Sequence, residues 1–338
     1  MSISRRATLG GLLAAPALAS PAFAAPRTLK ISHQFPAGTA TTGDFRDRMV
    51  RIFAAEVTKR TNGELVFEIY PGSSLMKTLA QFDAIRKGAL DITAYPLAYA
   101  GGQVPEVNVG LMPCLVSNYK QGSAWKNAEV GHRLAEVLES KGVKILTWVW
   151  QSGGVASRST PIVRPGDTKG MKFRGGSREM DLMLKDAGAI ISSVPSNEIY
   201  AAMQTGTLDA AVTSSTSLIS FRLQEISKSA TSGIDGSFWF MFEPLLMSKI
   251  VYDSLPADQQ KVISEVGASL EPFALDAARK DDEDFAGIFS KAGAKVETFS
   301  PAALDEWKAI AQRTAWKDFA ARNASCAELL KLAEQIPA

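Results

Sequence analysis

The feature that most constrains the fold is a repeated corner, in which a helical segment ends at a glycine and a short apolar strand follows. Glycine ends a helix here because it adopts the left-handed backbone conformation without strain. Regular alternation of helices and strands is typical of α/β proteins, in which helices cover a largely parallel sheet. The glycines that end the predicted helices are Gly63, Gly88, Gly142, Gly188, Gly206 and Gly293. The chain is therefore predicted to have an α/β fold.

A short internal repeat indicates two similar lobes. Residues 84–91 read AIRKGALD, and residues 202–209 read AMQTGTLD. Each segment is the end of a helix, a glycine, and a strand that carries an aspartate. A generic helix-to-strand corner would explain so short a repeat equally well, but the same order of helices and strands recurs around both copies. We therefore expect two related α/β lobes that face each other across a cleft.

A change of composition after residue 150 marks the predicted boundary between the lobes. Residues 151–166 are rich in glycine, serine and proline, which interrupt regular structure. A long helical region is expected from Pro256 to about Lys291, long enough to run across the back of both lobes. The predicted parts are lobe I over residues 25–150 with a returning segment at about 240–275, and lobe II over residues 151–239 with C-terminal helices at about 276–338.

The N-terminus has the pattern of an export signal. Two arginines at positions 5 and 6 precede an apolar run over residues 9–19, and an Ala-Phe-Ala motif ends at Ala24. We predict a signal peptide over residues 1–24, cleaved before Ala25. The run is too short and too interrupted by proline to span a bilayer. The paired arginines also resemble a twin-arginine signal, so two export routes remain open.

Composition and missing motifs argue against several functions. The net charge is +2 and the charges are scattered, so we expect no binding of nucleic acid. Zinc motifs, a nucleophile elbow and phosphate-binding glycine loops do not occur, so we predict no metal, no cofactor and no enzyme activity. Asp91 and Asp209 could be imagined as paired acids, but turn capping explains their positions better. For Cys114 and Cys326, both a disulfide and free thiols remain open.

One strand end is suited to binding an anion. Residues 171–174 alternate between apolar and basic side chains, which predicts a short strand that ends at Arg174. Two glycines follow, and Ser177 is placed to cap the next helix. Ligands of open α/β sheets bind beyond the carboxyl ends of strands, where helix N–H groups attract anions. We predict that Arg174 binds a carboxylate, assisted near Ser177. The alternative is a solvated or salt-bridged arginine.

Three ordered motifs resemble the periplasmic solute-binding subunits of TRAP (tripartite ATP-independent periplasmic) transporters. Residues 163–174, VRPGDTKGMKFR, are similar to that family's P-x-D-L-K-G-L-K-I-R, whose arginine binds the substrate carboxylate and corresponds to Arg174. Residues 194–210 resemble P-x-x-E-x-Y-x-A-L-Q-x-G-x-x-D-G, and residues 254–263 match S-L-P-x-D-x-Q-x-x-I. The resemblance extends over nearly the whole mature chain.

The resemblance implies a periplasmic-binding-protein fold, class II-like, with a ligand cleft between two lobes and a long bracing helix. It also implies that the protein is periplasmic and is not an enzyme. The expected partners are a small organic acid, which is trapped as the lobes close, and the membrane permease subunits that receive it and are driven by an ion gradient. An exported ligand sensor on this fold remains an alternative, as does a lyase-type enzyme that uses Asp209 or His33 as a base.

Departures from the family pattern affect the expected ligand. Thr213 stands where members that bind sialic acid carry an asparagine, and Val212 replaces the usual glutamate before it. Residues 153–157 also lack a second arginine. A single arginine near aromatic side chains favours a monocarboxylate with an apolar or aromatic body over a sugar acid, although these aromatics could equally be core. The predicted ligand-binding residues are Arg174, Trp150, Gln151, Ser152, Ser177, Thr213, Trp239, Phe238 and His33.

Overall fold

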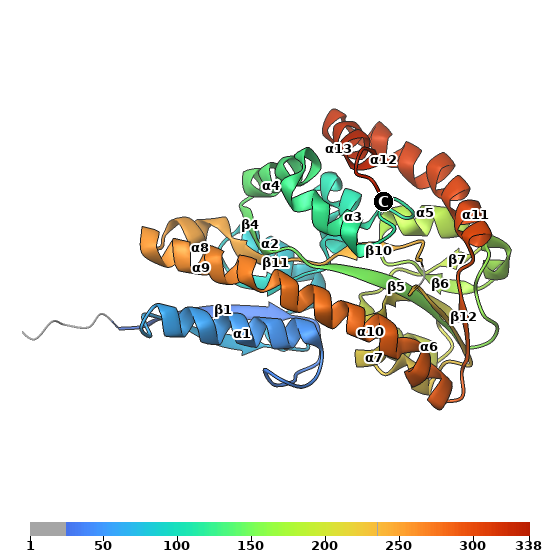
Figure 1. Ribbon diagram of the computed structural model, residues 1–338, viewed down its shortest axis with the longest axis horizontal. Coiled ribbons are helices and arrows are strands. Elements are labelled where there is room, and N and C mark those ends of the chain that lie inside the picture. The colour runs from blue at the N-terminus through green and yellow to red at the C-terminus, as the bar shows by residue number, and fades with distance from the viewer. Residues whose placement is uncertain (1–24, 235) are drawn as a thin grey trace, which may run out of the picture.

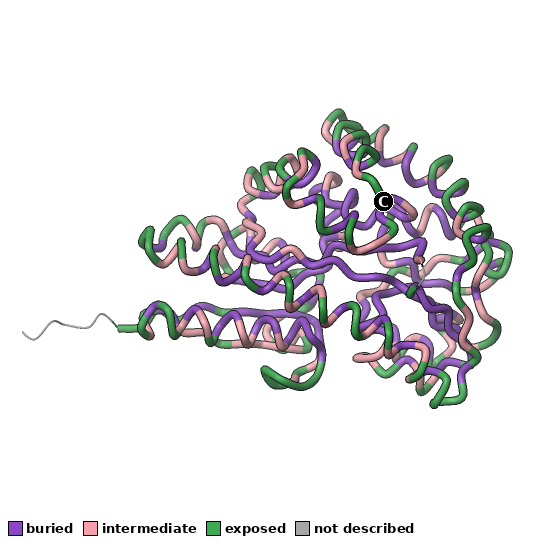
Figure 2. Tube along the Cα trace, viewed as in Figure 1, coloured by how far each residue is buried: buried purple, intermediate pink, exposed green. Residues whose placement is uncertain are grey.

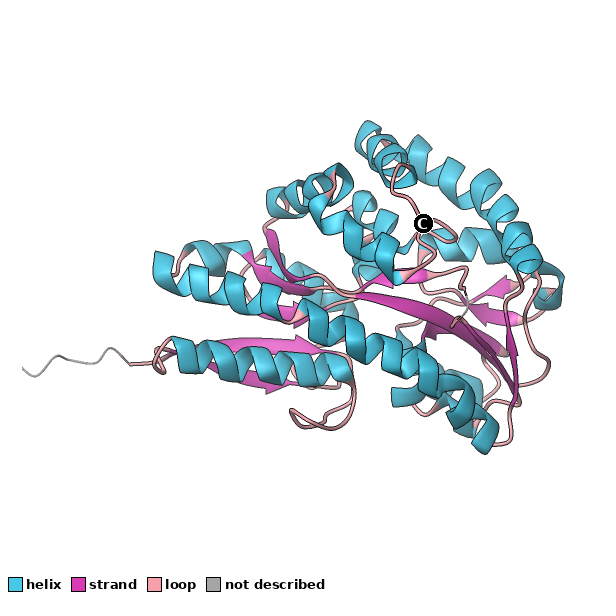
Figure 3. Cartoon of the chain, in the orientation of Figure 1, coloured by secondary structure: helices cyan, strands magenta, loops and turns pink. Residues whose placement is uncertain are grey.

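The computed structural model describes residues 25–234 and 236–338; the predicted signal peptide, residues 1–24, lies outside this part of the chain. Two mixed β-sheets, each covered by helices, form two lobes (Figure 1). Strand β5 (Trp150–Ser157) leads the chain from the first lobe into the second and is the long strand at the centre of Figure 3. The predicted two-lobed α/β fold is confirmed.

The first sheet combines strands from two distant parts of the chain. β1 runs parallel to β2 and β3, whereas β11 runs antiparallel to both of its neighbours, β3 and β4. A later segment of the chain therefore completes the sheet of the first lobe. In order across the sheet the strands are β2 (Leu65–Tyr70), β1 (Arg27–His33), β3 (Ile92–Ala94), β11 (Leu245–Ser248) and β4 (Val143–Thr147).

The second sheet repeats this arrangement. β6 is parallel to β7 and β8, and β5 is the antiparallel strand that follows them. β10 (Phe240–Phe242) pairs with the first part of β5. The two lobes therefore share one topology. In order across this sheet the strands are β12 (Lys295–Thr298), β9 (Ser229–Ser232), β5, β8 (Ala210–Ser214), β6 (Lys172–Arg174) and β7 (Ile190–Ile191).

The repeated aspartates have the same role in both lobes. Asp91 Oδ2 accepts a hydrogen bond of 2.6 Å from the backbone N–H of Lys30 on β1. Asp209 Oδ2 accepts one of 2.9 Å from the backbone N–H of Lys172 on β6. Each carboxylate ties its segment to the neighbouring parallel strand. The two acids belong to different sheets, and each has a structural partner, so the fold gives them a positioning role.

The strands form the buried interior and the helices cover it, as Figure 2 shows. α1 packs on β2, and α4 packs on β4. At the C-terminus, Trp307 Nε1 donates to Val163 O at 2.9 Å and Trp316 Nε1 donates to Pro113 O at 2.8 Å, so the final helices contact both lobes. The shorter helices are α1 (Phe45–Arg60), α2 (Gln81–Arg86), α3 (Tyr119–Ala124), α4 (Glu129–Ser140), α5 (Arg178–Asp186), α6 (Ile199–Gln204), α7 (Ser215–Ser220), α8 (Lys249–Asp253), α11 (Pro301–Ala311), α12 (Lys317–Arg322) and α13 (Ala324–Glu334).

A long helical rod braces both lobes and is interrupted once, at Leu270. It consists of α9 (Ala257–Ser269) and α10 (Glu271–Lys291). Pro272 lies in the first turn of α10 and has no N–H to continue the ladder of α9, so the helix begins again here. α9 contacts α1 and β4 in the first lobe, and α10 contacts α7 and β5 in the second. The predicted bracing helix is confirmed (Figure 1).

Two further observations bear on the sequence-based expectations. Cys114 and Cys326 are both free thiols, and burial raises the pKa of each to about 12, which keeps them protonated and unreactive at neutral pH. Within residues 25–234 and 236–338, no helix has both the length and the apolar character needed to cross a bilayer.

Asp282 on α10 should make stability depend on pH. Its side chain is buried and its Oδ2 accepts a hydrogen bond of 2.5 Å from Tyr119. Burial raises the pKa of Asp282 from 3.8 to about 6, although the hydrogen bond opposes the rise. Because the folded pKa is the higher one, the folded protein holds this proton more tightly, and stability is lost as the pH rises from about 4 to about 6.

We therefore expect the variant Asp282→Asn, which cannot ionise, to gain stability relative to the wild type across this window. One pKa unit corresponds to about 1.4 kcal/mol, so the gain should approach about 3 kcal/mol above pH 6. Urea unfolding of both proteins at pH 4, 5, 6 and 7 measures the difference, and titrating groups that do not interact with Asp282 cancel in the subtraction. A difference that stays constant over this range would contradict the assignment.

Candidate ligand-binding site

Arg174 lies at the carboxyl end of β6, as predicted, and is almost fully buried, with 2% of its surface exposed. Its guanidinium is held by three neutral oxygens from three different segments. Nε donates to Val194 O at 3.0 Å, Nη1 donates to Val212 O at 2.8 Å, and Nη2 donates to the Tyr99 hydroxyl at 2.9 Å. The side chain is therefore fixed in position before any ligand binds.

No acid neutralises this arginine. Among residues 25–234 and 236–338, the Arg174 guanidinium donates its hydrogen bonds to neutral oxygens only and has no carboxylate as a hydrogen-bonding partner. Asp181 is near enough for Arg174 to lower its pKa, but burial dominates and raises the pKa of Asp181 above its usual value. A buried charge without a counter-ion is unfavourable unless an anion joins it. The positive charge of Arg174 is thus not balanced by an ion pair within the described residues, and a bound anion would stabilise it.

Arg46 on α1 shows how the fold neutralises a second buried arginine. Its Nη2 lies 2.7 Å from Asp44 Oδ2, its Nη1 lies 2.8 Å from Glu243 Oε2, and its guanidinium stacks 3.6 Å from the ring centre of Phe35. Burial opposes ionisation, but the two carboxylates outweigh it and raise the pKa of Arg46. Of these two buried arginines, only Arg174 is left without an acid.

Arg174 also has N–H groups that make no hydrogen bond within the described residues. A guanidinium carries five N–H groups, and the three oxygens described above accept from three of them. One N–H on Nη1 and one on Nη2 have no partner in the described part of the chain. A carboxylate that binds an arginine with both of its oxygens accepts from two N–H groups of the guanidinium.

Gly176 allows Trp239 to approach this guanidinium. Its backbone has φ of +93°, and a Cβ there would lie 2.4 Å from Arg174 Nη1 and 2.9 Å from Trp239 Cη2. Any other residue would be strained and would collide with both groups. The Trp239 indole is fixed because its Nε1 donates to Leu111 O at 2.7 Å. Ser177 caps α5, as predicted, and its Oγ accepts from Met180 N at 3.0 Å.

A cavity of about 240 Å³ opens beside these residues, between the two lobes. Tyr99 and its neighbours line it from the first lobe, and the segment that follows Arg174 lines it from the second. An anion in this region would therefore contact both lobes. The residues that line the cavity are Leu79, Ala98, Tyr99, Gly176, Ser177, Arg178, Asp181, Ser193, Val194 and Pro195.

Three further predicted residues lie at or near the network around Arg46. Gln151 Nε2 donates to Glu243, and its Oε1 is buried without a partner among the described residues. Thr213 is buried on β8, where it pairs with Gly154. His33 is buried at the end of β1, with its Nε2 3.1 Å from Asp47 Oδ1. The structure gives Gln151 and His33 structural partners on the first-lobe side.

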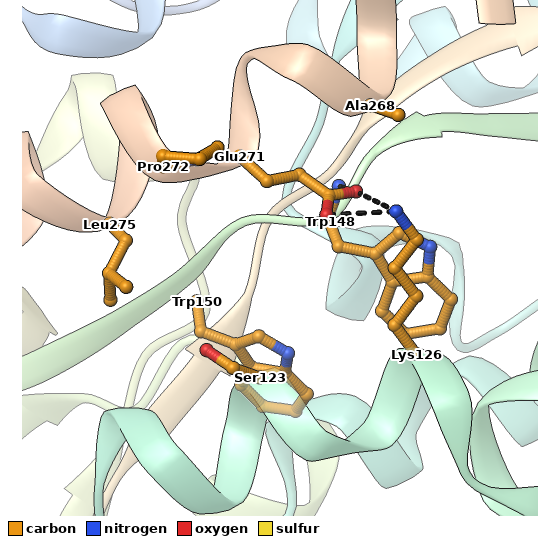
Figure 4. A pocket seen from close by; sticks show the side chains of 8 residues that line it. All are labelled: Ser123, Lys126, Trp148, Trp150, Ala268, Glu271, Pro272 and Leu275. Atoms are coloured by element: carbon orange, nitrogen blue, oxygen red, sulfur yellow. Dashed lines mark hydrogen bonds and ion pairs between the residues drawn. The ribbon is translucent and has the colours of Figure 1, made fainter. Parts of the chain in front are cut away.

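The remaining predicted residues have partners elsewhere. Phe238 packs in the core, with its ring centre 4.9 Å from that of Trp307. Ser152 Oγ donates to Gly233 O at 3.2 Å. Trp150 lines a separate pocket of about 310 Å³ next to the break in the long helix, and this pocket shares no lining residue with the cavity beside Arg174 (Figure 4). Arg174, Ser177 and Trp239 are thus the predicted residues that the fold brings together.

Tyr99, which lines the cavity, and the buried network around Arg46 were both missed by the sequence-based reasoning. Tyr99 lies on a short 3₁₀ helix, Leu97–Ala100, outside the recognisable motifs. The Arg46 network joins α1 to Glu243, which is far away in the sequence. The sequence signal that could have identified Tyr99 is the buried strand β3, which ends shortly before it. The carboxyl ends of parallel strands lie at the same edge of a sheet, where ligands bind.

The described residues contain no group of three or more His, Cys, Asp or Glu side chains placed to hold a metal ion.

Comparisons with known proteins identify the family of this chain. The model of the family described as bacterial extracellular solute-binding protein, family 7, matches residues 37–323. A solute-binding protein of Albidiferax ferrireducens is 60% identical over 328 residues, which are 97% of this chain and 97% of that protein. The C4-dicarboxylate-binding periplasmic protein DctP of Rhodobacter capsulatus is 28% identical over 85% of this chain and 86% of its own.

The fold comparison agrees with the sequence comparison. The crystal structure of a TRAP periplasmic solute-binding protein from Rhodoferax ferrireducens, with bound malonate, is 61% identical and superposes with a TM-score of 0.90. The match covers 91% of this chain and 98% of that chain. The predicted family, the periplasmic location and the absence of enzyme activity are therefore confirmed. The chain belongs to the TRAP periplasmic solute-binding proteins, family 7.

Proposed function

We propose that this protein captures a small organic acid between its lobes through an arginine clamp formed by Arg174, and delivers it to a TRAP permease in the membrane. The observation that carries the clamp is the buried guanidinium of Arg174, which has two spare N–H groups and no acidic partner in the described chain. A ligand carboxylate supplies both the missing charge and the missing acceptors.

The difference between Arg174 and Arg46 bears on how a ligand with two carboxylates could bind. Arg46 is already neutralised by Asp44 and Glu243, so it offers no comparable anion site. Malonate, the acid bound by the relative from Rhodoferax ferrireducens, has two carboxylates. We infer that one of them would bind Arg174, because Arg178, an arginine that lines the cavity, is already paired with Asp318 at 3.0 Å. Monocarboxylates with an apolar or aromatic body therefore remain good candidates beside malonate.

Closure of the lobes explains how such a site serves transport. Arg174 belongs to the second lobe and Tyr99 to the first, and a ligand between them contacts both. A ligand that makes contacts only in the closed form shifts the population towards closure. The permease would then distinguish the loaded protein by its shape. A permease gene beside this gene would support transport over a sensor role.

The proposal predicts that carboxylates bind and that matched amides do not. We would screen malonate, propionate and benzoate against malonamide, propionamide and benzamide by thermal shift, and then measure affinities by calorimetry. A ligand at a hundredfold its Kd adds about 2.7 kcal/mol to stability, which raises Tm by several degrees. Equal shifts by acids and amides would contradict an anion site. The absence of any shift would contradict capture of these acids.

A further inference from the structure

The hydroxyl of Tyr99 has its two acceptor positions filled from the second lobe. It accepts one hydrogen bond of 2.9 Å from Arg174 Nη2 and another of 2.9 Å from the backbone N–H of Ser196. A tyrosine oxygen has one O–H to donate as well. The structure pairs this proton with no acceptor in residues 25–234 or 236–338. Tyr99 therefore acts as an acceptor within the fold and keeps its donor free.

The free donor is held next to the free donors of Arg174. The 2.9 Å bond places the Tyr99 oxygen one hydrogen bond away from Nη2, the nitrogen that carries a spare N–H. The Tyr99 ring is packed edge-on against Tyr95, with ring centres 5.9 Å apart, so the hydroxyl is held in place by packing. Tyr99 also lines the cavity between the lobes. An anion bound to the two free N–H groups of Arg174 would thus lie close to a third hydrogen-bond donor, the Tyr99 hydroxyl.

We infer that Tyr99 is a ligand-binding residue that donates its O–H to the ligand carboxylate. The inference rests on the proposed arginine clamp and adds to it a contact from the first lobe. With the two N–H groups of Arg174, the carboxylate would receive three donors, one of them uncharged. Because Tyr99 and Arg174 belong to different lobes, all three donors converge only when the lobes are closed. Tyr99 thus makes tight carboxylate binding depend on closure.

The test begins with Tyr99→Phe, which removes the hydroxyl and keeps the ring. Calorimetry with the best-binding acid of the screen should show a 10- to 100-fold loss of affinity, since hydrogen bonds to a charged group contribute more than neutral ones. Tyr252→Phe is the matched control, because that hydroxyl contacts Gln260 O and Ser264 on α9 and should leave affinity unchanged. Thermal unfolding without ligand confirms that both variants are folded.

A second variant separates donation to the ligand from support of Arg174. Incorporating 4-aminophenylalanine at position 99 restores a donor of similar size but accepts hydrogen bonds poorly. Recovery of most of the affinity lost in Tyr99→Phe would support the inference. Affinity as low as in Tyr99→Phe would overturn it, because the hydroxyl would then matter only as an acceptor. Unchanged affinity in Tyr99→Phe would also overturn it. Failure of the wild type to bind any acid would instead reject the proposed function.

Discussion

Replacing Arg174 with lysine should weaken carboxylate binding by roughly 30- to 1000-fold, although the positive charge is kept. Truncating one partner of a buried, hydrogen-bonded charge pair costs about 2–4 kcal/mol. Lysine offers one ammonium in place of the planar fork and cannot bind two carboxylate oxygens in parallel. It also cannot hold the Val194 and Val212 carbonyls and the Tyr99 hydroxyl together, as Arg174 does. Calorimetry with the best-binding acid measures the loss.

Arg164→Lys is the control for this experiment. Arg164 lies in the same motif, but its side chain is exposed and its partner is Glu306 at 3.3 Å. Exposed ion pairs contribute about 0–1 kcal/mol, and this one does not border the cavity, so affinity should stay within twofold of the wild type. If Arg174→Lys binds as tightly as Arg164→Lys, the arginine clamp is wrong and the anion binds elsewhere in the cleft.

Local pattern was enough to predict the neighbourhood of Arg174. Alternation placed it at a strand end, and the following glycines and Ser177 marked the start of a helix, all of which the structure confirms. These features depend on neighbours in the sequence, which set backbone conformation directly. The repeated aspartates predicted the shared topology of the lobes for the same reason, since each aspartate binds the backbone of its own parallel pair.

Which aromatic residues lie near Arg174 could not be predicted in this way. Phe238 and Trp239 are adjacent, so they point to opposite sides of an extended chain. Alternation alone does not say which side is the core and which is the cleft. In the structure Phe238 packs on Trp307, whereas Trp239 packs beside Gly176. The same applies to Trp150. Whether its side chain faces the core or the cleft depends on the placement of α3 and the long helix, which alternation does not predict.

Tyr99 and Arg46 were missed because their partners are distant in the sequence. Tyr99 acquires its role from Arg174 and Ser196, which lie 75 and 97 residues away. Arg46 stands in a helix with several basic residues and looks like part of a solvated face, yet it is fully buried. Burial of a charge is decided by tertiary packing, which helical periodicity does not report.

Arg46 differs from Arg174 in that two carboxylates balance its charge within the fold, and we expect its loss to affect stability. Arg46 joins the first lobe to the second, because its guanidinium also donates to Ser217 Oγ on α7 at 3.1 Å. Replacing it with methionine would leave the carboxylates of Asp44 and Glu243 buried without a counter-ion. Breaking a buried ion pair from one side costs about 3–5 kcal/mol. We expect Arg46→Met to lose about this much free energy of unfolding.

Arg60→Met, on the same helix, is the matched control. Arg60 pairs with Glu265, but both side chains are partly exposed, so this change should cost about 0–1 kcal/mol. Urea unfolding of the ligand-free proteins measures both values. Equal losses in the two variants would show that Arg46 contributes no more than a surface arginine. A large loss for Arg46 alone would show that its charge is balanced within the fold by Asp44 and Glu243.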